Sequence, residues 1–360
     1  MASSTAKGLI FLLASFTLEY GFGFTKPDSI RPHYVKIYDK QFFIGPAFSQ
    51  RSASFQLINA LHHRDKITYR PNNEFTAGVR AHIFGVGVEG SLSVPQGKKS
   101  SSRLGSSDMF DLSFNSVGEK WITELGFQHF NGFYLNPSWQ KLGIKDVFPQ
   151  RSDIDLRTVN LSTVYIFNHE HFSEESPYLF SEHQIHSSGS FLFGLMYARF
   201  KISASSALIS TADQSHFAKG ADYKHLDFIS FGVLPGYSYT FVHKNAFLNV
   251  TGQAGPAHYW NNYRNETGGD HYDIDLNFVY SYRLALGYNG DTFFYGITYS
   301  SKNTQSQVQN TRMSGSSSTL RILAGMRIKE KGVFTKRMID LERWLGLKKK
   351  KPTQSPGSHP

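Results

Sequence analysis

Residues 273 to 288 alternate between apolar and polar positions along their whole length. The even positions carry large apolar or aromatic side chains from Ile274 to Tyr288, whereas most odd positions, such as Asp273 and Arg283, are polar. Because successive side chains of a strand point to opposite faces, this period of two predicts a strand and excludes a helix. At about 3.3 Å per residue the strand would exceed the usual globular length, so we expect a thick apolar phase against one face.

The same alternation recurs along most of the chain. The clearest further segments are 75–90, 246–255, 291–300 and 318–329, and noisier ones are 41–59, 107–116, 120–135, 154–167, 187–202 and 226–242. An open sheet in hydrocarbon would leave unpaired edge groups that each cost several kcal/mol, so the strands must close into a ring. We therefore predict an all-β fold, an antiparallel transmembrane β-barrel of about 10–12 strands.

Polar turn and loop segments separate these strands. They contain Pro, Gly, Asn or Ser and lie at 69–73, 95–107, 135–150, 265–269, 289–291 and 303–318. The pair Asn289 and Gly290 predicts a tight hairpin turn, whereas the connections before residue 273 and at 303–318 are expected to be long. Short turns at one rim and long loops at the other are typical of a transmembrane barrel.

The composition fits this class of protein. Among 360 residues there are 31 Phe, 19 Tyr, 4 Trp and 31 Gly, as expected for tight turns and aromatic girdles. No run of 18 apolar residues follows the N-terminal segment, which excludes helical membrane spans. Cys is absent, which excludes a disulfide framework, a thiolate nucleophile and a Cys-ligated metal.

The N-terminal segment predicts export from the cytoplasm. Residues 1–23 contain one cation, Lys7, then an apolar stretch and small residues, which indicates a secretory signal peptide. Glu19 and Tyr20 crowd the cleavage site, so an uncleaved anchor remains the alternative. The barrel domain is predicted to follow at 35–330.

The C-terminal segment is basic and has a helical pattern. Residues 331–349 place Phe334, Met338, Leu341 and Leu345 on one side, which suits an amphipathic helix on a membrane surface. Residues 350–360 are predicted to be a disordered tail. Nucleic acid binding by the lysines at 348–351 is disfavoured, because no aromatic and basic platform accompanies them and the chain is expected to be exported.

The alternation predicts that a set of polar residues points into the lumen of the barrel. The candidate lumen residues are Arg80, His82, Glu124, Arg157, Asp273, Asp275, Arg283, Arg321 and Arg327, of which only Arg157 has an unclear parity. Charges in a lumen must pair or stay hydrated. An excess of cations would favour small anionic solutes, whereas complete pairing would plug a narrow lumen. Both alternatives stay open.

Candidate chemistry is sparse. The signatures G-x-S-x-G, H-E-x-x-H and G-x-x-x-x-G-K-[ST] are not found. His82 beside Arg80 could act as the base of a membrane-embedded lipid hydrolase, but a lumen histidine in a polar network is favoured. The weak metal-ligand candidates are His169, His171, His183 and His186, with Glu174, Glu175 and Glu182 nearby. Their spacing matches no metal-site signature, so we predict a polar loop, no metal and no cofactor.

Two segments resemble a known family. "KITYRPNNEFTAGV" (66–79) and "SEHQIHSSGSFLFGLMYARF" (181–200) are similar to segments of uncharacterised bacterial outer-membrane β-barrel proteins known only as a domain of unknown function. The resemblance covers most of residues 35–330. It implies residence in the outer membrane of a Gram-negative bacterium and supplies no activity, substrate or catalytic residue.

The sequence thus favours a porin-like outer-membrane barrel that acts as a channel, a binding protein or a structural protein. Its expected partners are outer-membrane lipid and small anionic solutes, and not nucleic acid; the oligomeric state stays open. The alternatives are a membrane-embedded lipid hydrolase and a soluble exported β-protein with the apolar faces as its core. Against a soluble core, each of the many Tyr hydroxyls would need a buried partner.

Two arginine substitutions test the faces of segment 273–288. Tyr282→Arg would place a cation against lipid, at a cost of about 2–4 kcal/mol near mid-depth, whereas Ser281→Arg would place it in the lumen. We expect the folding yield in detergent micelles, measured by heat-dependent gel mobility, to fall strongly for Tyr282→Arg and little for Ser281→Arg. Equal yields, or the reverse order, would mean that the faces are assigned wrongly.

Overall fold

The structure is a computed structural model that describes residues 30–38, 41–72, 75–83, 85–143, 145–217, 221–266, 268–329 and 331. The predicted signal peptide (1–23) and tail (350–360), and the predicted helix (331–349) apart from its first residue, lie outside the described residues. None of the helices in the described ranges is both long and apolar enough to cross a membrane.

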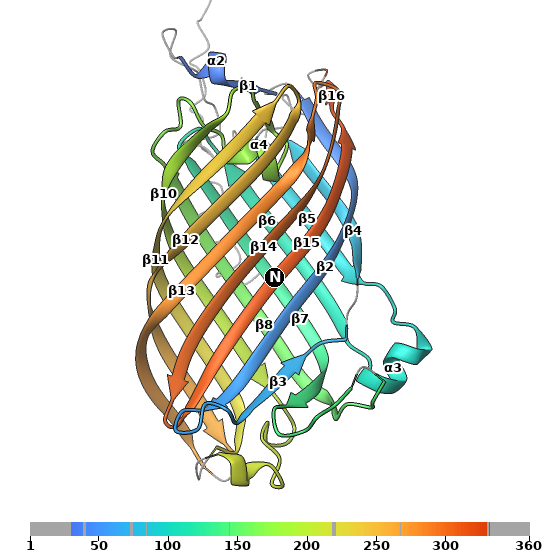
Figure 1. The fold of residues 1–360 in the computed structure, drawn as a ribbon, viewed down its shortest axis with the longest axis vertical. Coiled ribbons are helices and arrows are strands. Elements are labelled where there is room, and N and C mark those ends of the chain that lie inside the picture. The colour runs from blue at the N-terminus through green and yellow to red at the C-terminus, as the bar shows by residue number, and fades with distance from the viewer. Residues whose placement is uncertain are drawn as a thin grey trace, which may run out of the picture.

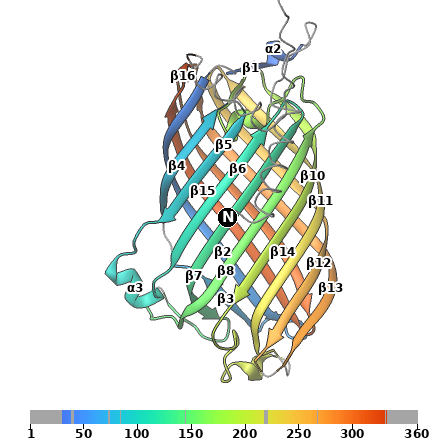
Figure 2. The same ribbon diagram turned by 180° about the vertical axis from the view of Figure 1, so that it is seen from behind.

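The described strands form a closed antiparallel β-barrel (Figure 1 and Figure 2). The wall consists of β2 (Gln41–Asn59), β3 (Lys66–Arg70), β4 (Thr76–Ile83), β5 (Val86–Ser93), β6 (Asp108–Val117), β7 (Trp121–Pro137), β8 (Gln150–Ile166), β10 (Ser188–Ser203), β11 (Tyr223–His243), β12 (Ala246–Asn265), β13 (Asp270–Asn289), β14 (Phe293–Val308), β15 (Thr311–Met326) and β16 (Ile328–Lys329). Pairing of β15 with β2 closes the ring, which confirms the predicted fold class.

The barrel has more strands at one end than at the other. At the upper end, the top of Figure 1, where β2 begins, the described ring runs β2, β4, β5, β6, β7, β8, β10, β11, β12, β13, β14, β15 and has twelve strands. At the lower end β3 replaces β4, β5 and β6 between β2 and β7, so ten of the described strands form the ring. Both numbers agree with the predicted range. The connection between β5 and β6 carries α3 (Lys98–Leu104), which lies outside the wall.

A bulge in the pairing of β7 with β8 marks the level at which the two parts of the barrel meet. β7 pairs with β6 as far as Asn131 and with β3 from Tyr134, and its register with β8 shifts between Asn131 and Phe133. Gly132 at the bulge has a φ of 82°, a left-handed conformation that glycine adopts without strain. Across this shift Asn131 pairs with Asp155 and Phe133 with Arg151, so three residues of β8 lie opposite Gly132. Phe130 and Phe133, on either side of it, both pack in the interior.

The apolar side of the wall changes half-way along the barrel. In the upper half apolar side chains point outward, for example Phe48 of β2 and Leu161 of β8, which are 56% and 39% exposed. In the lower half they point inward, for example Phe55 and Leu156 of the same strands, which are fully buried. Outer positions of the lower half are mostly polar. β13 is the exception, since its outer face is apolar along its length, as the sequence predicted.

Two clusters of buried apolar side chains cross the lumen. The upper cluster contains Phe43, Val117, Ile122, Ile166, Phe172, Tyr178, Leu179, Phe180, Leu192, Phe247, Ala285, Phe294 and Leu323. The lower cluster contains Ala53, Phe55, Leu57, Ile67, Tyr69, Met109, Phe130, Phe133, Leu135, Ile154, Leu156, Ile202, Ala204, Leu208, Ile209, Phe217, Ala221, Tyr223, Leu226, Phe228, Tyr263, Val308 and Met313. Burying a large apolar side chain stabilises a fold by about 1.5–3 kcal/mol, so both clusters stabilise the barrel from inside its lumen.

The connections agree only in part with the predicted layout. At the upper end most are short, such as 244–245 and 290–292, but residues 167–187 form a long loop there. At the lower end most are longer, such as 138–149 and 204–222. The predicted long loop at 303–318 is wrong, because β14 and β15 continue through it and meet in the turn at 309–310. Polar residues occupy both faces of these strands, with Gln307 exposed and Ser306 buried, which hid the alternation.

The bulge at Gly132 gives a test of the change in strand number. A Cβ atom at Gly132 would lie 2.3 Å from the backbone oxygen of Ser106, whereas one at Gly126 of the same strand would meet nothing within 4 Å. The left-handed φ alone costs an alanine about 1–2 kcal/mol. Because the contact with Ser106 adds to this cost, we expect Gly132→Ala to lower the urea midpoint of unfolding by more than the left-handed φ alone would. Gly126→Ala should leave the midpoint almost unchanged. Equal midpoints for the two variants would contradict the bulge.

Candidate functional site

A polar cavity of about 300 Å³ lies between the two apolar clusters, and we call it the central chamber. Inward side chains of the wall and one loop residue carry its charge. The charged residues that line it are Arg51, Arg80, Glu89, Asp111, Glu124, Glu174, Arg283, Lys302 and Arg321.

Three arginines converge on Glu89 from neighbouring strands. The Nη2 atoms of Arg51 and Arg321 lie 2.5 and 3.1 Å from Glu89 Oε1, and Arg80 Nε lies 4.0 Å from Oε2. Arg51 also donates to Asp111 at 2.9 Å. Three cations here face two carboxylates, so this network leaves positive charge uncompensated.

A second network joins the wall to the loop at 167–187. Arg283 of β13 donates to Glu124 of β7 at 3.1 Å and to Glu174 of the loop at 3.0 Å. Its guanidinium lies 4.1 Å from the ring centre of Tyr178, within the range of a cation–π contact. The loop is therefore held against the chamber wall by charge as well as by the upper cluster.

The chamber as a whole has more cations than anions. Five cations and four carboxylates line it among the described residues. Among the described residues, no carboxylate lies within 4 Å of Lys302 Nζ. This atom donates to Asn160 Oδ1 at 3.3 Å. Arg80 is buried, and its Nη1 has no hydrogen-bond partner among the described residues. Buried charge that is only partly compensated is costly, so the excess of cations favours an anion in the chamber.

The alternation in the sequence predicted some of the residues of this site. Arg80, Glu124, Arg283 and Arg321 line the chamber, as predicted for lumen residues. It missed five members, which are Arg51, Glu89, Asp111, Glu174 and Lys302. One signal was present, since Glu89 lies directly opposite Arg80 in the register of β4 with β5. A cross-strand pair of opposite charge at that position could have identified Glu89.

Four other predicted lumen residues lie outside the chamber. Arg327 and His82 point inward near the upper cluster, where His82 stacks on Phe43 at 5.7 Å. Asp273 and Asp275 lie at the lower end of β13, where Asp275 accepts the backbone N–H of Gln307 at 2.8 Å. The carboxylates of Asp273 and Asp275 therefore do not neutralise the chamber arginines.

The prediction for Arg157 is wrong. Its side chain lies on the outer face of β8, 59% exposed, and pairs with Asp155 at 2.9 Å. The reason is the reversal of polarity in β8, because Ile154 and Leu156 turn inward below mid-height while Leu161 turns outward above it. An assignment of faces from apolar residues alone fails at such a reversal.

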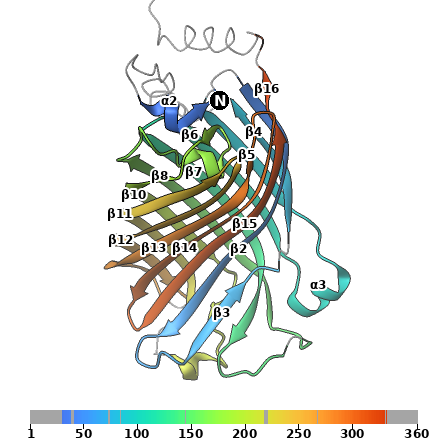
Figure 3. The same ribbon diagram turned by 45° about the horizontal axis from the view of Figure 1, so that its top comes forward.

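The loop at 167–187, which we call the plug loop, closes the upper end. It contains α4 (Glu175–Tyr178) and β9 (Glu182–Gln184). β9 pairs with β1 (Val35–Ile37), which follows α2 (Arg31–Tyr34). We call residues 31–38 the N-terminal latch. Figure 3, with the top turned forward, shows α2 and β1 at the upper opening.

Arg31 fixes the latch to the plug loop. It is almost fully buried and donates to both carboxylate oxygens of Glu182 at 2.7 and 2.8 Å. It also donates to the carbonyl oxygens of His169 and Phe172. Burial opposes its charge, yet the Glu182 carboxylate raises the pKa of Arg31. Burial and the same carboxylate raise the pKa of Glu175 well above its usual range, so a neutral Glu175 fits beside Glu182.

Arg327 holds the other side of the upper rim. Its guanidinium donates to the carbonyl oxygen of Phe180 at 2.6 Å and to Asn289 Oδ1 at 2.5 Å. It also lies 4.0 Å from the ring centre of Tyr38. The last wall strand, the plug loop and the latch thus meet at one cation.

The predicted histidine cluster does not form a metal site in the structure. No group of three or more His, Asp or Glu residues among those described could hold a metal ion. His171 and His186 instead flank Tyr34, with ring centres 4.3 and 5.7 Å away. Glu182 of the same segment is engaged by Arg31. The cluster therefore contributes packing between the latch and the plug loop.

Comparisons with known proteins identify a family and distant structural neighbours. The model of a family described as "Domain of unknown function (DUF4421)" matches residues 26–327. A search of curated proteins finds no match. The outer membrane protease OmpT from Escherichia coli aligns with a TM-score of 0.38 and 6% identity, over 82% of this chain and 98% of that one.

Two further structures align less well. Ail, the attachment invasion locus protein of Yersinia pestis in complex with a heparin analogue, gives a TM-score of 0.24 and 11% identity, over 78% and 99% of the two chains. The Pseudomonas putida toluene transporter TodX gives 0.27 and 8%, over 80% and 89%. Such weak similarity carries no argument about function, and the strand pairing itself establishes the barrel.

The latch offers a buried and an exposed ion pair for comparison. Glu182→Gln leaves Arg31 buried without its carboxylate, at a cost of about 3–5 kcal/mol, whereas Asp291→Asn breaks the exposed pair with Lys36, worth about 1 kcal/mol or less. We expect limited proteolysis to cut the plug loop much faster in Glu182→Gln and at the normal rate in Asp291→Asn. Equal cleavage rates would mean that Arg31 does not hold the loop.

Proposed function

The chain belongs to the DUF4421 family, whose description names no activity, and from its own geometry we propose that it is an outer-membrane β-barrel that binds small anionic solutes in the central chamber. The observation that carries the proposal is the central chamber, in which the cations outnumber the carboxylates. The barrel wall supplies the membrane anchor, and the two apolar clusters keep the bound anion from bulk water.

The outer face supports insertion in a membrane. Large apolar residues are exposed on strands around the upper half, for example Phe48 on β2, Phe191 on β10 and Ile297 on β14, with exposed fractions of 49–69%. A soluble protein rarely exposes a continuous apolar surface of this kind. The apolar band of outer-membrane barrels is about 25 Å tall, and the polar outer wall of the lower half then projects into water.

The interior supports binding rather than open diffusion. Both apolar clusters contain side chains from strands on all sides of the wall, and the plug loop adds its own. A solute therefore reaches the chamber only when the plug loop or the lower cluster moves. Guanidinium groups that are already paired with carboxylates recognise a planar or tetrahedral oxyanion through their remaining donors.

Sulfate, as a simple oxyanion, tests the chamber. Arg80→Gln removes the arginine that is held most weakly by Glu89, and Arg157→Gln removes the same charge from the outer wall. We expect sodium sulfate to raise the thermal midpoint of the wild type and of Arg157→Gln with the same half-saturating concentration. For Arg80→Gln the half-saturating sulfate concentration should be about tenfold higher, because this variant lacks one charge-assisted hydrogen bond to the anion.

Two results would contradict the proposal. One is a sulfate effect of the same size in Arg80→Gln and in the wild type, because the stabilisation would then be a general salt effect. The other is a thermal midpoint of the wild type that is no higher in sodium sulfate than in sodium chloride of the same ionic strength.

A further inference from the structure

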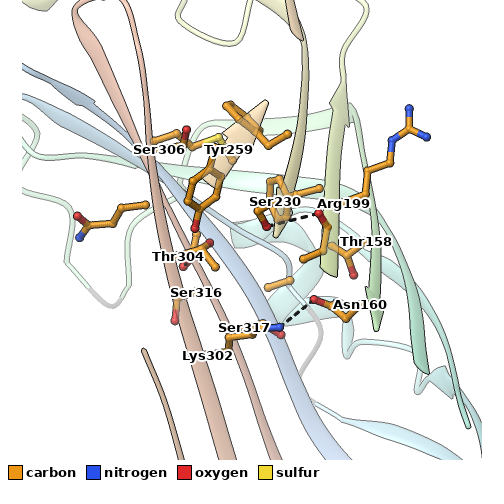
Figure 4. A pocket seen from close by; sticks show the side chains of 17 residues that line it. Thr158, Asn160, Arg199, Ser230, Tyr259, Lys302, Thr304, Ser306, Ser316 and Ser317 are labelled. Atoms are coloured by element: carbon orange, nitrogen blue, oxygen red, sulfur yellow. Dashed lines mark hydrogen bonds between the residues drawn. The ribbon is translucent and has the colours of Figure 1, made fainter. Parts of the chain in front are cut away.

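A second cavity, of about 70 Å³, adjoins the central chamber, and Figure 4 shows the side chains that line it. It shares Asn160, Lys302 and Ser317 with the chamber, so the two spaces are neighbours. Its lining combines polar and apolar side chains. Lys302 and hydroxyl groups such as Ser317 supply its polar part, and apolar side chains such as Phe228 belong to the lower cluster.

Lys302 is the charged group that faces this cavity. Its Nζ donates to Asn160 Oδ1 at 3.3 Å, and no carboxylate of the described chain lies within 4 Å of it. Glu124, an acid of the adjoining chamber, is already paired with Arg283. Arg199 also contributes to the lining, but Figure 4 shows its guanidinium pointing away, where it pairs with Asp227 on the outer face.

We propose that this cavity binds a small monocarboxylate, with the carboxylate on Lys302 and the alkyl tail on Phe200, Phe228 and Met313. The inference deepens the proposed function, because it rests on the chamber admitting anions and specifies the anion that this cavity retains. An ammonium and an amide donor suit a carboxylate. The apolar side chains of the lining would gain nothing from an inorganic ion, but they would bury a short hydrocarbon tail.

The volume of the cavity sets the size of the ligand. A group of the size of a water molecule needs about 10–15 Å³ of cavity volume. The cavity of 70 Å³ therefore admits a ligand of about five to seven non-hydrogen atoms. Butanoate has this size, acetate leaves the apolar end empty, and octanoate is too long. Each buried methylene improves affinity about fourfold until the cavity is full.

The test uses the full chain refolded in a non-ionic detergent and follows its thermal midpoint as sodium carboxylates are added. Acetate, butanoate, hexanoate and octanoate vary the tail, and butan-1-ol supplies the tail without the charge. We expect the half-saturating concentration to fall about fourfold per methylene from acetate to butanoate and to rise again for octanoate. Butan-1-ol should give no saturable effect.

Three variants locate the site. Lys302→Met, which removes the charge, should weaken the effect of butanoate about tenfold or more, whereas Lys302→Arg should retain it. Lys201→Met removes an exposed lysine from the outer wall and should behave as the wild type. The series of tail lengths on the wild type decides the question even if Lys302→Met folds poorly.

The outcomes separate this inference from the proposed function. Stabilisation that grows steadily with tail length, or that persists in Lys302→Met, would overturn the carboxylate site, because it would reflect partition into the micelle. If sulfate still acts through Arg80 in that case, the chamber proposal survives. If neither sulfate nor any carboxylate stabilises the protein, both proposals fail.

Discussion

The rest of the structure depends on one constraint, which is that the wall must present opposite polarities in its two halves. Above mid-height the apolar residues point outward, as Phe48 does, and below it they point inward, as Phe55 does on the same strand. The upper half thus buries its apolar surface in a surrounding phase and the lower half in its own core. The central chamber lies in the upper half, next to the upper cluster.

The change in strand number follows the same division. A barrel widens roughly in proportion to its strands, and small barrels are filled by side chains alone. The ten-strand part is filled in this way by the lower cluster, packed around Tyr69 and Phe133. The twelve-strand part is wider, so side chains leave the chamber open and the plug loop fills the remaining space. The bulge at Gly132 joins the two parts.

Much of the fold could be predicted from alternation, and the failures have physical causes. The face that carries Arg80, and the faces that carry Arg283 and Arg321, were assigned correctly because each segment keeps one polarity over many residues. Arg157 was assigned wrongly because β8 reverses its polarity beside it. The ion-pair partners of the chamber are distant in sequence, such as Glu174 for Arg283. No local pattern marks a loop residue as part of a lumen.

The central claim is that this barrel spans a membrane while its lumen is closed at both ends. Conductance across a planar lipid bilayer tests it most directly, with insertion of the full chain established independently by protection from added protease. The account predicts that inserted barrels carry no steady current at moderate voltage. A steady, ohmic current that scales with the number of inserted barrels would contradict it, because the apolar clusters would then leave an open pore.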